Sequence, residues 1–491
     1  MSPWSEIRFT REGKRVYRLF IGGKWVESSN QKTFDVKNSA TGKLVARVQR
    51  ATPDDALRAI ESAYKTKSVI AGMPAVQRIE LLEKIHELVV KYQKDLVDVI
   101  VHEAGKPVIY AEGEVKATYE RLHCAAEEAK TFQGEYIPGE IAPDTVKKFA
   151  IVSRKPRGVV LAISSFNYPL YISIAKIAPA IVSGNSVVLK AASDDPICTL
   201  MFARLAELAG MPKGVFNVVT GSSSEIGDLM VSDSRVNMIS FTGSTYVGKH
   251  IADIAGMKRI HLELGGKCPA IVLEDADLDL AVKECLTGTL KFSGQRCDAI
   301  SRVIVVDRIA NDFVERTLKG IKKWGVGDPR NRKTKIGPLI NQKAIEKVEV
   351  LVNDAVEKGA KLMYGGKKRG LYYYPTVLDN VNQNMRIAWE ETFGPIVTII
   401  RVKDEREAVK IANQSNFGLD ACVFTKDVDK AVSIARRLED GSVTINAHPS
   451  HGLGNFPFGG DKDSGIGREG LNYSIDEMTK LHTIVFTRIS K

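Results

Sequence analysis

The sequence predicts an α/β protein built on two parallel, doubly wound sheets. Apolar, strand-like runs alternate with helical patterns from residue 148 onward, and this alternation is typical of helices packed on both faces of a parallel sheet. It occurs twice, first over residues 148–263 and again after Glu263. A chain of 491 residues is also long enough for two or three domains with cores of their own. Ligands of such sheets bind beyond the carboxyl ends of the strands, so functional residues are expected there.

The first 147 residues are expected to hold a short hairpin and a set of helices. Residues 18–26 carry a strand pattern on each side of Gly22 and Gly23, which predicts two antiparallel strands. Over residues 52–133 apolar side chains recur at spacings of three and four, which places them on one face of each helix. The expected helices begin at Pro53, at Pro74, after Lys91 and after Ala111.

Two series of strands and helices follow, after a strand-like run that ends at residues 156–158. In the first series we expect strands at residues 159–163, 186–189, 215–219 and 238–241, with helices beginning near Pro169, Pro196 and Ser224. In the second series we expect strands at residues 270–273, 302–306, 398–402 and 421–424, with helices from Leu278 and Ile309. Residues 480–488 form a strand-like tail. Because an isolated strand needs a partner edge, we expect another subunit to supply it.

Composition and charge exclude several classes of protein. The chain is 44% hydrophobic and 26% charged, the balance of an ordinary globular protein rather than a disordered or fibrous one. Lys and Arg number 70 against 59 Asp and Glu, which gives a net charge of +11. The basic residues form only short groups, with no zinc-finger or RNA-recognition signature, so we expect no nucleic-acid partner. The excess of positive charge suits a small anionic substrate.

The cysteines and the N-terminal residues indicate where the protein acts. The six cysteines are far apart and form no Cys-x-x-Cys pair, so we expect reduced thiols. The N-terminal residues carry charges where a secretory leader needs an apolar core, and no run approaches the roughly 18 apolar residues of a membrane span. The protein is therefore expected to be cytoplasmic, with no membrane partner.

Several well-known motifs are missing. The sequence has no HExxH, no GxSxG elbow, no phosphate-binding GxxxxGK[ST] loop and no cysteine–histidine metal spacing, so no metal is expected. One GxGxxG occurs at residues 465–470, but no expected strand precedes it. We interpret it as a structural loop rather than a dinucleotide site.

A better phosphate candidate spans residues 241–248, FTGSTYVG, where a strand ends in a glycine turn and a helical pattern begins. The free N–H groups and positive dipole of a helix N-terminus suit a pyrophosphate. An ordinary strand-to-helix turn of an α/β fold is the alternative.

Two further residues are candidates for chemistry. Glu263 lies in an apolar run before the glycines of ELGGK, where desolvation raises a carboxyl pKa toward that of a general base. The alternative is a structural ion pair. Cys297 follows Gly-Gln-Arg, and we expect the adjacent Arg296 to lower the thiol pKa and favour a nucleophilic thiolate. The alternative is a cysteine that fills the core.

Together these motifs resemble the aldehyde dehydrogenase family. The resemblance is carried by ELGGK around Glu263, GQRC ending at Cys297, FNYP at residues 166–169 and EETFGP at residues 390–395, and it extends over about residues 20–486. It implies that Cys297 attacks the aldehyde to form a thiohemiacetal, which passes a hydride to a nicotinamide and becomes a thioester. Glu263 then activates the water that releases the acid, and Asn167 stabilises the oxyanion together with the Cys297 backbone N–H.

The same resemblance implies a dinucleotide site. The residues implied in it are Lys190, Ser193, Gly243, Ser244, Gly248, Leu264, Glu391 and Phe393. Members that prefer NAD often carry a glutamate where this chain has Ser193. A glutamate would repel a 2′-phosphate, so we expect NADP to be preferred and NAD to remain possible.

The substrate is predicted from the residues beside the motifs. GQRC with FNYP resembles the non-phosphorylating glyceraldehyde-3-phosphate dehydrogenases of the family, which hold the substrate phosphate with arginines and a tyrosine. In this chain Arg296 and Tyr168 stand at the matching positions. Bacterial and plant members have an arginine where this chain has Ala117, and Arg121 lies one turn further on the same helix face. This pattern resembles archaeal members. His451 occupies a position where this group often has an arginine, and either a phosphate contact or loop packing accounts for it.

Two other functions stay open. A semialdehyde dehydrogenase, for example for succinate semialdehyde, would also use the arginines. A catalytically silent structural or nucleic-acid-binding member would leave Cys297, Glu263 and Asn167 occurring together without a reason.

The resemblance also implies the domain organisation. We expect a Rossmann-type cofactor domain at residues 1–131 and 148–263, an α/β catalytic domain at 264–460, and a β oligomerisation arm at 132–147 and 461–491. A homotetramer, a dimer of dimers, is the expected assembly.

Overall fold

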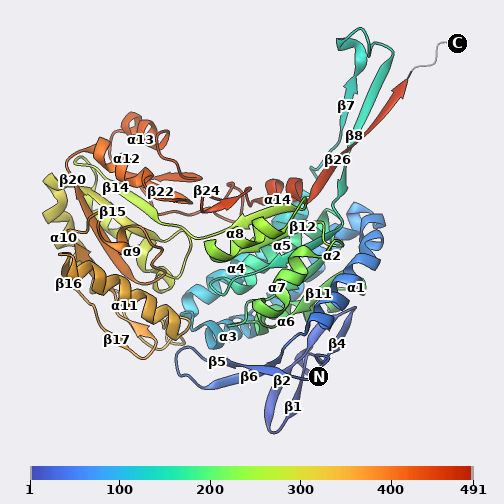
Figure 1. Ribbon diagram of the computed structural model, residues 1–491, viewed down its shortest axis with the longest axis horizontal. Coiled ribbons are helices and arrows are strands. Elements are labelled where there is room, and N and C mark those ends of the chain that lie inside the picture. Colours follow the sequence, from blue (N-terminus) through green and yellow to red (C-terminus); the bar gives the residue numbers. More distant parts are fainter. Residues whose placement is uncertain (1–2, 488–491) are drawn as a thin grey trace.

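The computed structural model describes residues 3–487 and shows two α/β bodies, a small N-terminal sheet and a projecting arm (Figure 1). The N-terminal sheet has the order β1-β2-β6-β5, made of β1 (Arg8–Arg11), β2 (Lys14–Tyr17), β6 (Leu44–Gln49) and β5 (Thr33–Lys37). Among residues 3–487, none of the helices has both the length and the hydropathy needed to cross a membrane.

The first body is an eight-stranded sheet whose five central strands are parallel, as predicted. In sheet order its strands are β25 (Gly465–Ile466), β13 (Arg259–Glu263), β12 (Met238–Thr242), β9 (Val159–Ile163), β10 (Ser186–Lys190), β11 (Phe216–Val219), β3 (Leu19–Ile21) and β4 (Lys24–Val26). The predicted hairpin is β3 and β4. The chain runs from β9 outward to β11 and then returns to β12, so the order reverses between β9 and β12. Ligands bind at such a switch point.

Helices cover both faces of this sheet (Figure 1). They are α1 (Pro53–Gly72), α2 (Ala75–Lys91), α3 (Gln93–Ala104), α4 (Val108–Glu128), α5 (Pro169–Val182), α6 (Ile197–Leu208), α7 (Ser223–Ser232) and α8 (Thr245–Ile254). One apolar core lies beneath α2, α4, α5 and α6, and a second lies beneath α1, α7 and α8. Helix α4 starts at Val108 and not after Ala111 as expected, because Pro107 takes the N-cap position, where it donates no hydrogen bond.

The second body is a seven-stranded sheet. In order it contains β16 (Lys361–Tyr364), β19 (Thr376–Asp379), β20 (Ile396–Val402), β15 (Ile300–Val306), β14 (Cys268–Val272), β22 (Asp420–Phe424) and β23 (Ser442–Ile445). All neighbours pair in parallel except β16 with β19. Its helices are α9 (Leu278–Leu290), α10 (Asp307–Ile321), α11 (Gln342–Glu357), α12 (Glu405–Asn413) and α13 (Val428–Ala435).

The arm corrects two expectations. It consists of β7 (Glu135–Pro138), β8 (Lys148–Pro156) and β26 (Thr479–Thr487), and it projects from the first body (Figure 1). The tail strand β26 pairs with β8 of its own chain along nine residues, so the expectation that another subunit pairs with it is wrong for this edge. Residues 148–156 therefore belong to the arm sheet and not to the sheet that begins at β9. A strand pattern gives the period of a strand but not its partner.

Most of the segment after residue 460 also lies outside the arm. β24 (Asp461–Lys462) pairs with β21 (Phe417–Gly418), β25 pairs with β13, and α14 (Leu471–Glu477) packs on α4 and α5. Only β26 joins the arm sheet, so the expected arm boundary at residue 461 is too early. The GxGxxG segment begins with β25, which agrees with its interpretation as structural.

Candidate active site

The three catalytic candidates line one cavity of about 350 Å³. Asn167 lies in the loop after β9, Glu263 ends β13, and Cys297 lies between α9 and β15. The first two come from the carboxyl ends of strands in the first body and the third comes from the second body. The cavity therefore lies where the two bodies meet, close to the switch point of the first sheet.

The loop that carries Cys297 has a strained backbone. Phe292 and Ser293 have φ values of +52° and +56°, a left-handed conformation that side chains with a Cβ rarely adopt. The loop is anchored because Ser293 Oγ donates to the carbonyl of Gly337 (2.9 Å) and Gln295 Oε1 accepts from Ile340 N (2.9 Å). Strain of about 1–3 kcal/mol per residue persists only where the surroundings fix it. The loop thus holds the thiol at a defined position.

The thiol of Cys297 does not gain the activation that the sequence predicted. Burial raises its pKa well above the ordinary value, and the nearby carboxylates of Asp298 and Glu263 add to the rise. Arg296 does not offset this, because its guanidinium is paired with both oxygens of Asp298 (2.9 and 2.7 Å). The net pKa of Cys297 is therefore raised, and not lowered as expected from the adjacent Arg296.

Glu263 has the environment of a buried base. Its side chain is buried, and neither carboxylate oxygen accepts a hydrogen bond from the described residues. Burial raises the pKa of Glu263 to about 7, and His261 opposes the rise. A carboxyl group with this pKa is divided between its two protonation states near neutral pH, which suits proton transfer.

The amide of Asn167 is oriented by its neighbours. Its Oδ1 accepts from Ser165 Oγ (2.8 Å) and from Tyr168 N (3.1 Å). With its oxygen occupied, the Nδ2 group remains available as a donor in the cavity that also contains Cys297. The following helix α5 is fixed because Glu114 accepts from the backbone N–H groups of Leu170 and Tyr171.

The substrate candidates Arg121, Tyr168, Arg296 and His451 all line this cavity. Arg121 donates to Tyr171 Oη (3.0 Å) and lies 3.4 Å from Glu469 Oε1. Ala117, the position expected to hold an arginine in bacterial and plant members, lines the same cavity. Arg121 lies one helical turn further on and also lines it, so the cavity still has a cation there. The aromatic ring of Tyr168 lies 3.7 Å from Lys106 Nζ, a cation–π contact.

His451 reaches the cavity but is also bound within the protein. Its Nε2 lies 3.0 Å from Asp420 Oδ2, and its ring packs on Phe458. Burial alone would lower the pKa of His451, but the Asp420 carboxylate outweighs burial and raises it. Asp298, Asp420 and His451 lie close enough to share a cation. Asp298 is already paired with Arg296, so its charge is not free for a metal.

Sequence reasoning missed Lys291, Lys176 and Glu469. Lys291 lines the cavity and forms no ion pair with any residue in the described range 3–487. Burial and the neighbouring Arg296 lower its pKa. Lys176 is fully buried 3.8 Å from Glu469 Oε2, and its Nζ has no hydrogen-bond partner among the described residues. The nearness of Lys291 to Cys297 in the chain was the one available signal.

The residues expected to hold a dinucleotide fit a phosphate-bearing ligand. Lys190 is buried at the end of β10 and donates to a single carbonyl, that of Ala191 (3.3 Å); burial lowers its pKa to about 8, so an anion would stabilise its charged form. Ser244 caps α8, and a Cβ on Gly248 would lie 2.3 Å from Leu264 Cδ2, so a larger residue would displace the Leu264 side chain. Ser193 is exposed and donates to the Gly221 carbonyl. Its side chain is a hydroxyl, so this position carries no carboxylate.

Two other candidates lie on the second body. Glu391 Oε1 accepts from Gly266 N (3.3 Å), and burial raises the pKa of this carboxyl group. Phe393 has a φ of +52°, and its ring makes an edge contact with Phe166 of the FNYP motif. Glu391 is thereby tied to the glycines that follow Glu263, and Phe393 is tied to the loop that carries Asn167.

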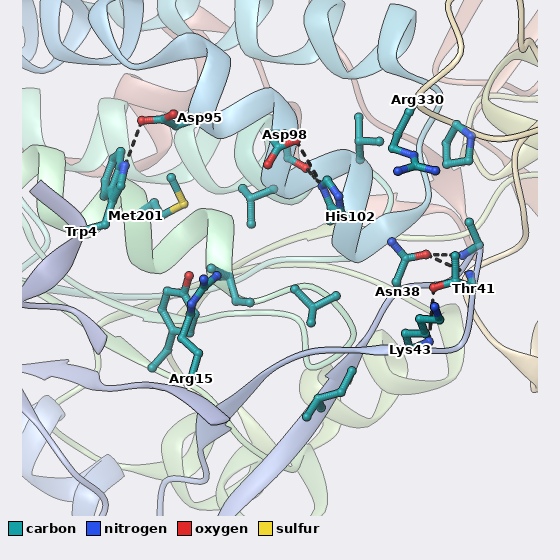
Figure 2. Close-up of a pocket in the computed structure, with 18 of the residues that line it drawn as sticks. Trp4, Arg15, Asn38, Thr41, Lys43, Asp95, Asp98, His102, Met201 and Arg330 are labelled. Atoms are coloured by element: carbon teal, nitrogen blue, oxygen red, sulfur yellow. Dashed lines mark hydrogen bonds and ion pairs between the residues drawn. The ribbon is translucent and has the colours of Figure 1, made fainter. Parts of the chain in front are cut away.

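A larger cavity of about 600 Å³ lies elsewhere, between the N-terminal sheet and α3 (Figure 2). Several of its polar side chains are already paired: Trp4 Nε1 donates to Asp95 Oδ2 (2.9 Å), and His102 lies 3.3 Å from Asp98 Oδ1. It contains none of the residues predicted from the motifs. The smaller cavity around Cys297 is therefore the candidate active site.

Residues 25–484 match the aldehyde dehydrogenase family. The chain is 43% identical to the NADP-dependent glyceraldehyde-3-phosphate dehydrogenase of Streptococcus equinus, over 96% of this chain and 99% of that protein. It is 38% identical to the 3-sulfolactaldehyde dehydrogenase of Priestia aryabhattai, over 96% and 98%.

Solved structures agree with these similarities. The NADP-dependent glyceraldehyde-3-phosphate dehydrogenase of Bacillus halodurans complexed with NADP has a TM-score of 0.95 and 40% identity, covering 96% of this chain and 99% of that one. The archaeal glyceraldehyde-3-phosphate dehydrogenase of Methanocaldococcus jannaschii complexed with NADP has a TM-score of 0.89 and 37% identity, covering 93% and 100%.

Proposed function

The chain belongs to the aldehyde dehydrogenase family, and on that premise we propose that it oxidises D-glyceraldehyde 3-phosphate to 3-phosphoglycerate with NADP, without inorganic phosphate. The observation that carries the proposal is that Cys297 shares one cavity with three cationic side chains, Arg121, Lys291 and Arg296. A three-carbon aldehyde with a phosphate at its far end presents a dianion to such a site, and guanidinium groups bind phosphate oxygens in matched geometry.

The first half of the reaction forms a covalent intermediate on Cys297. Because burial raises the pKa of Cys297, its thiol first gives up a proton to solvent. The resulting thiolate attacks the aldehyde carbon, and the Asn167 amide donates to the developing oxyanion together with the Cys297 backbone N–H. Preorganised donors of this kind contribute about 10²-fold or more in rate. A bound NADP would accept the hydride, which would leave a thioester on Cys297.

The second half releases the acid. Glu263 takes a proton from water while the water oxygen bonds to the thioester carbon, and the carbon–sulfur bond breaks to restore the Cys297 thiolate. The buried Glu263 suits this step, because its carboxylate oxygens accept no hydrogen bond from the described residues and one of them is free to receive the proton.

The cofactor preference follows from the groups at the end of β10. Lys190 supplies the cation for the 2′-phosphate of NADP, and Ser193 leaves that position without a repelling carboxylate. Gly243, Ser244 and Gly248 border the pyrophosphate at the start of α8, with Leu264 packed beside them. Glu391 and Phe393 hold the nicotinamide side, and NAD remains an acceptable substitute.

A sulfonated aldehyde is the second candidate substrate. A relative of this chain is named a 3-sulfolactaldehyde dehydrogenase, and a sulfonate is a tetrahedral anion that the same cations would bind. Succinate semialdehyde, with a carboxylate, is the third. Competition among the three aldehydes at equal concentration ranks them by kcat/KM.

The test of the proposed function is NADPH formation from purified protein, glyceraldehyde 3-phosphate and NADP in buffer free of phosphate and arsenate. We expect reduction in the wild type and none in Cys297→Ser. A requirement for phosphate or arsenate would overturn the non-phosphorylating reaction. Preference for a sulfonated or carboxylated aldehyde would keep the chemistry and replace the substrate.

The division of labour in the fold is part of the proposal. The first body binds the cofactor, the second carries the nucleophile, and the arm of β7, β8 and β26 joins subunits into a homotetramer.

A further inference from the structure

His261 lies beside the general base on the same strand. His261 and Glu263 are two residues apart on β13, so their side chains lie on the same face of the sheet. His261 Nε2 is 3.2 Å from Glu263 Oε1, an ion-pair contact without the alignment of a hydrogen bond. His261 Nδ1 is 2.9 Å from Glu477 Oε2, at the end of α14. The imidazole is thus held between two carboxylates.

This arrangement requires a close approach of the backbone from the GxGxxG segment. Gly467 has a φ of +91°, and a Cβ there would lie 2.6 Å from Glu477 Oε1 and 2.8 Å from His261 Nδ1. Any larger residue would collide with the pair. Gly467 of the GxGxxG segment therefore leaves room for the contact between His261 and Glu477.

The ionisable groups around the pair come from elements of both bodies. Lys176 on α5 and Glu469 after β25 act on Glu263, and Lys176 also acts on His261. Glu477 is held in turn by Arg259, whose Nη2 donates to its Oε1 (3.0 Å). Cys297 and His451 respond to the charge of Glu263 from the second body.

We propose that His261 is a positioning residue that carries a proton on both ring nitrogens and keeps the neighbouring Glu263 ionised for thioester hydrolysis. Carboxylates only accept hydrogen bonds, so a ring with a carboxylate at each nitrogen is most stable when both nitrogens are protonated. The cation then offsets the cost of keeping a charged carboxylate away from water. The inference rests on the proposed role of Glu263 as the base.

The protonation energetics agree with this geometry. Burial alone would lower the pKa of His261, but Glu263 and Glu477 outweigh burial and raise it to about 9. For Glu263, burial is the largest influence and raises the pKa, whereas His261 is the leading influence in the opposite direction. His261 neither gains nor loses a proton during hydrolysis. It sets the pH above which Glu263 is able to take one from water.

The experiment compares wild type with His261→Gln in two measurements over about pH 5.5 to 9.5. A stopped-flow burst of NADPH reports acylation, and the decay of the acyl-enzyme, followed by mass spectrometry after acid quench, reports hydrolysis. We expect the acid limb of hydrolysis to move up by about one pH unit in the variant. The rate near pH 6.5 then falls about tenfold, while the rate near pH 9 stays within about twofold.

A control and a second readout separate the possible failures. His123→Gln removes a histidine that is also paired with a glutamate, Glu83 (2.9 Å), but whose side chain is half exposed, and its profile is expected to match wild type. An equal loss of hydrolysis at every pH in His261→Gln, or an unmoved acid limb, would overturn the proposal. No NADPH burst in wild type would instead overturn the proposed function.

The wild type alone provides a test if His261→Gln does not fold. Hydrogen–deuterium exchange at the imidazole C2 position, read for each histidine by peptide mass spectrometry, gives individual titration midpoints. We expect the midpoint of His261 in the folded protein to lie above the midpoint of the same histidine in the unfolded chain. A midpoint at or below that of the unfolded chain contradicts a doubly protonated His261.

Discussion

Arg296 donates hydrogen bonds from Nε and Nη2 to the two carboxylate oxygens of Asp298, while its Nη1 has no partner among residues 3–487. The bidentate contact fixes the plane of the guanidinium. One donor edge is therefore held in the cavity that contains Cys297, ready for an oxygen of an anionic substrate.

Replacing Arg296 is expected to remove selectivity for anions. In Arg296→Ala, kcat/KM for glyceraldehyde 3-phosphate should fall about 10- to 100-fold, because a charge-assisted hydrogen bond is lost and Asp298 then repels the phosphate. An uncharged aldehyde of equal length should lose less than about threefold. Steady-state kinetics on both substrates measures the difference. Equal losses on both would place Arg296 outside the anion site, and Asp298→Asn serves as the control that keeps the arginine.

Lys291 is expected to contribute to the same anion site. Its ammonium group forms no ion pair within the described chain, so a phosphate in the cavity would be able to pair with it. Lys291→Gln should raise KM for glyceraldehyde 3-phosphate about tenfold with little change in kcat. The exposed Lys319, paired with Glu315, gives a matched control as Lys319→Gln. If both variants behave alike in substrate titrations, Lys291 has no part in binding.

Four parallel strands of the first body could be predicted because local pattern determines them, whereas β13 was not among the expected strands. The strands β9, β10, β11 and β12 begin and end within one residue of their expected positions. Buried parallel strands give continuous apolar runs, which are easy to recognise. Edge strands were harder: β23 is only half buried and β16 is exposed, and neither was predicted.

The surroundings of the candidate catalytic residues could not be predicted in the same way. His261 and Glu477 are 216 residues apart in the chain, and no local pattern links them. Arg296 and Asp298 are only two apart, yet the sequence alone did not reveal that Asp298 pairs with the arginine next to Cys297. Motifs identify residue types, whereas pKa values depend on charges that the whole fold brings together.

Glu263→Gln is expected to stop the reaction after one turnover. The amide is unable to take a proton from water, so the steady-state rate should fall by about 10²- to 10⁴-fold while the first NADPH still forms. In wild type, hydrolysis should slow as the pH falls below about 7, because the raised pKa leaves less of Glu263 ionised. Stopped-flow NADPH traces across pH measure both effects. A lost burst in the variant would mean that Glu263 acts before hydride transfer.

Ser193→Glu is expected to reverse the cofactor preference. A carboxylate near Lys190 would repel the 2′-phosphate, so kcat/KM for NADP should fall about tenfold or more, whereas that for NAD should hold or rise. Initial rates with each dinucleotide at saturating aldehyde provide the ratio. Ser193→Gln has nearly the same size without the charge and should keep the preference for NADP. A similar loss in both variants would indicate a steric effect instead of a charge effect.

The arm is expected to hold the assembly together. β26 is an edge strand of the arm sheet, and it exposes Leu481 (61%) and Val485 (60%) on one of its faces. Apolar residues this exposed on a projecting sheet are typical of a protein interface. Light scattering after size exclusion should give four 54.0 kDa subunits for wild type and a smaller species for the double variant L481D/V485D. Val356→Asp, at an exposed valine of α11 (41%), is the control that should leave the mass unchanged. An unchanged mass in the arm variant would show that another surface joins the subunits, because two buried carboxylates would each oppose association by several kcal/mol.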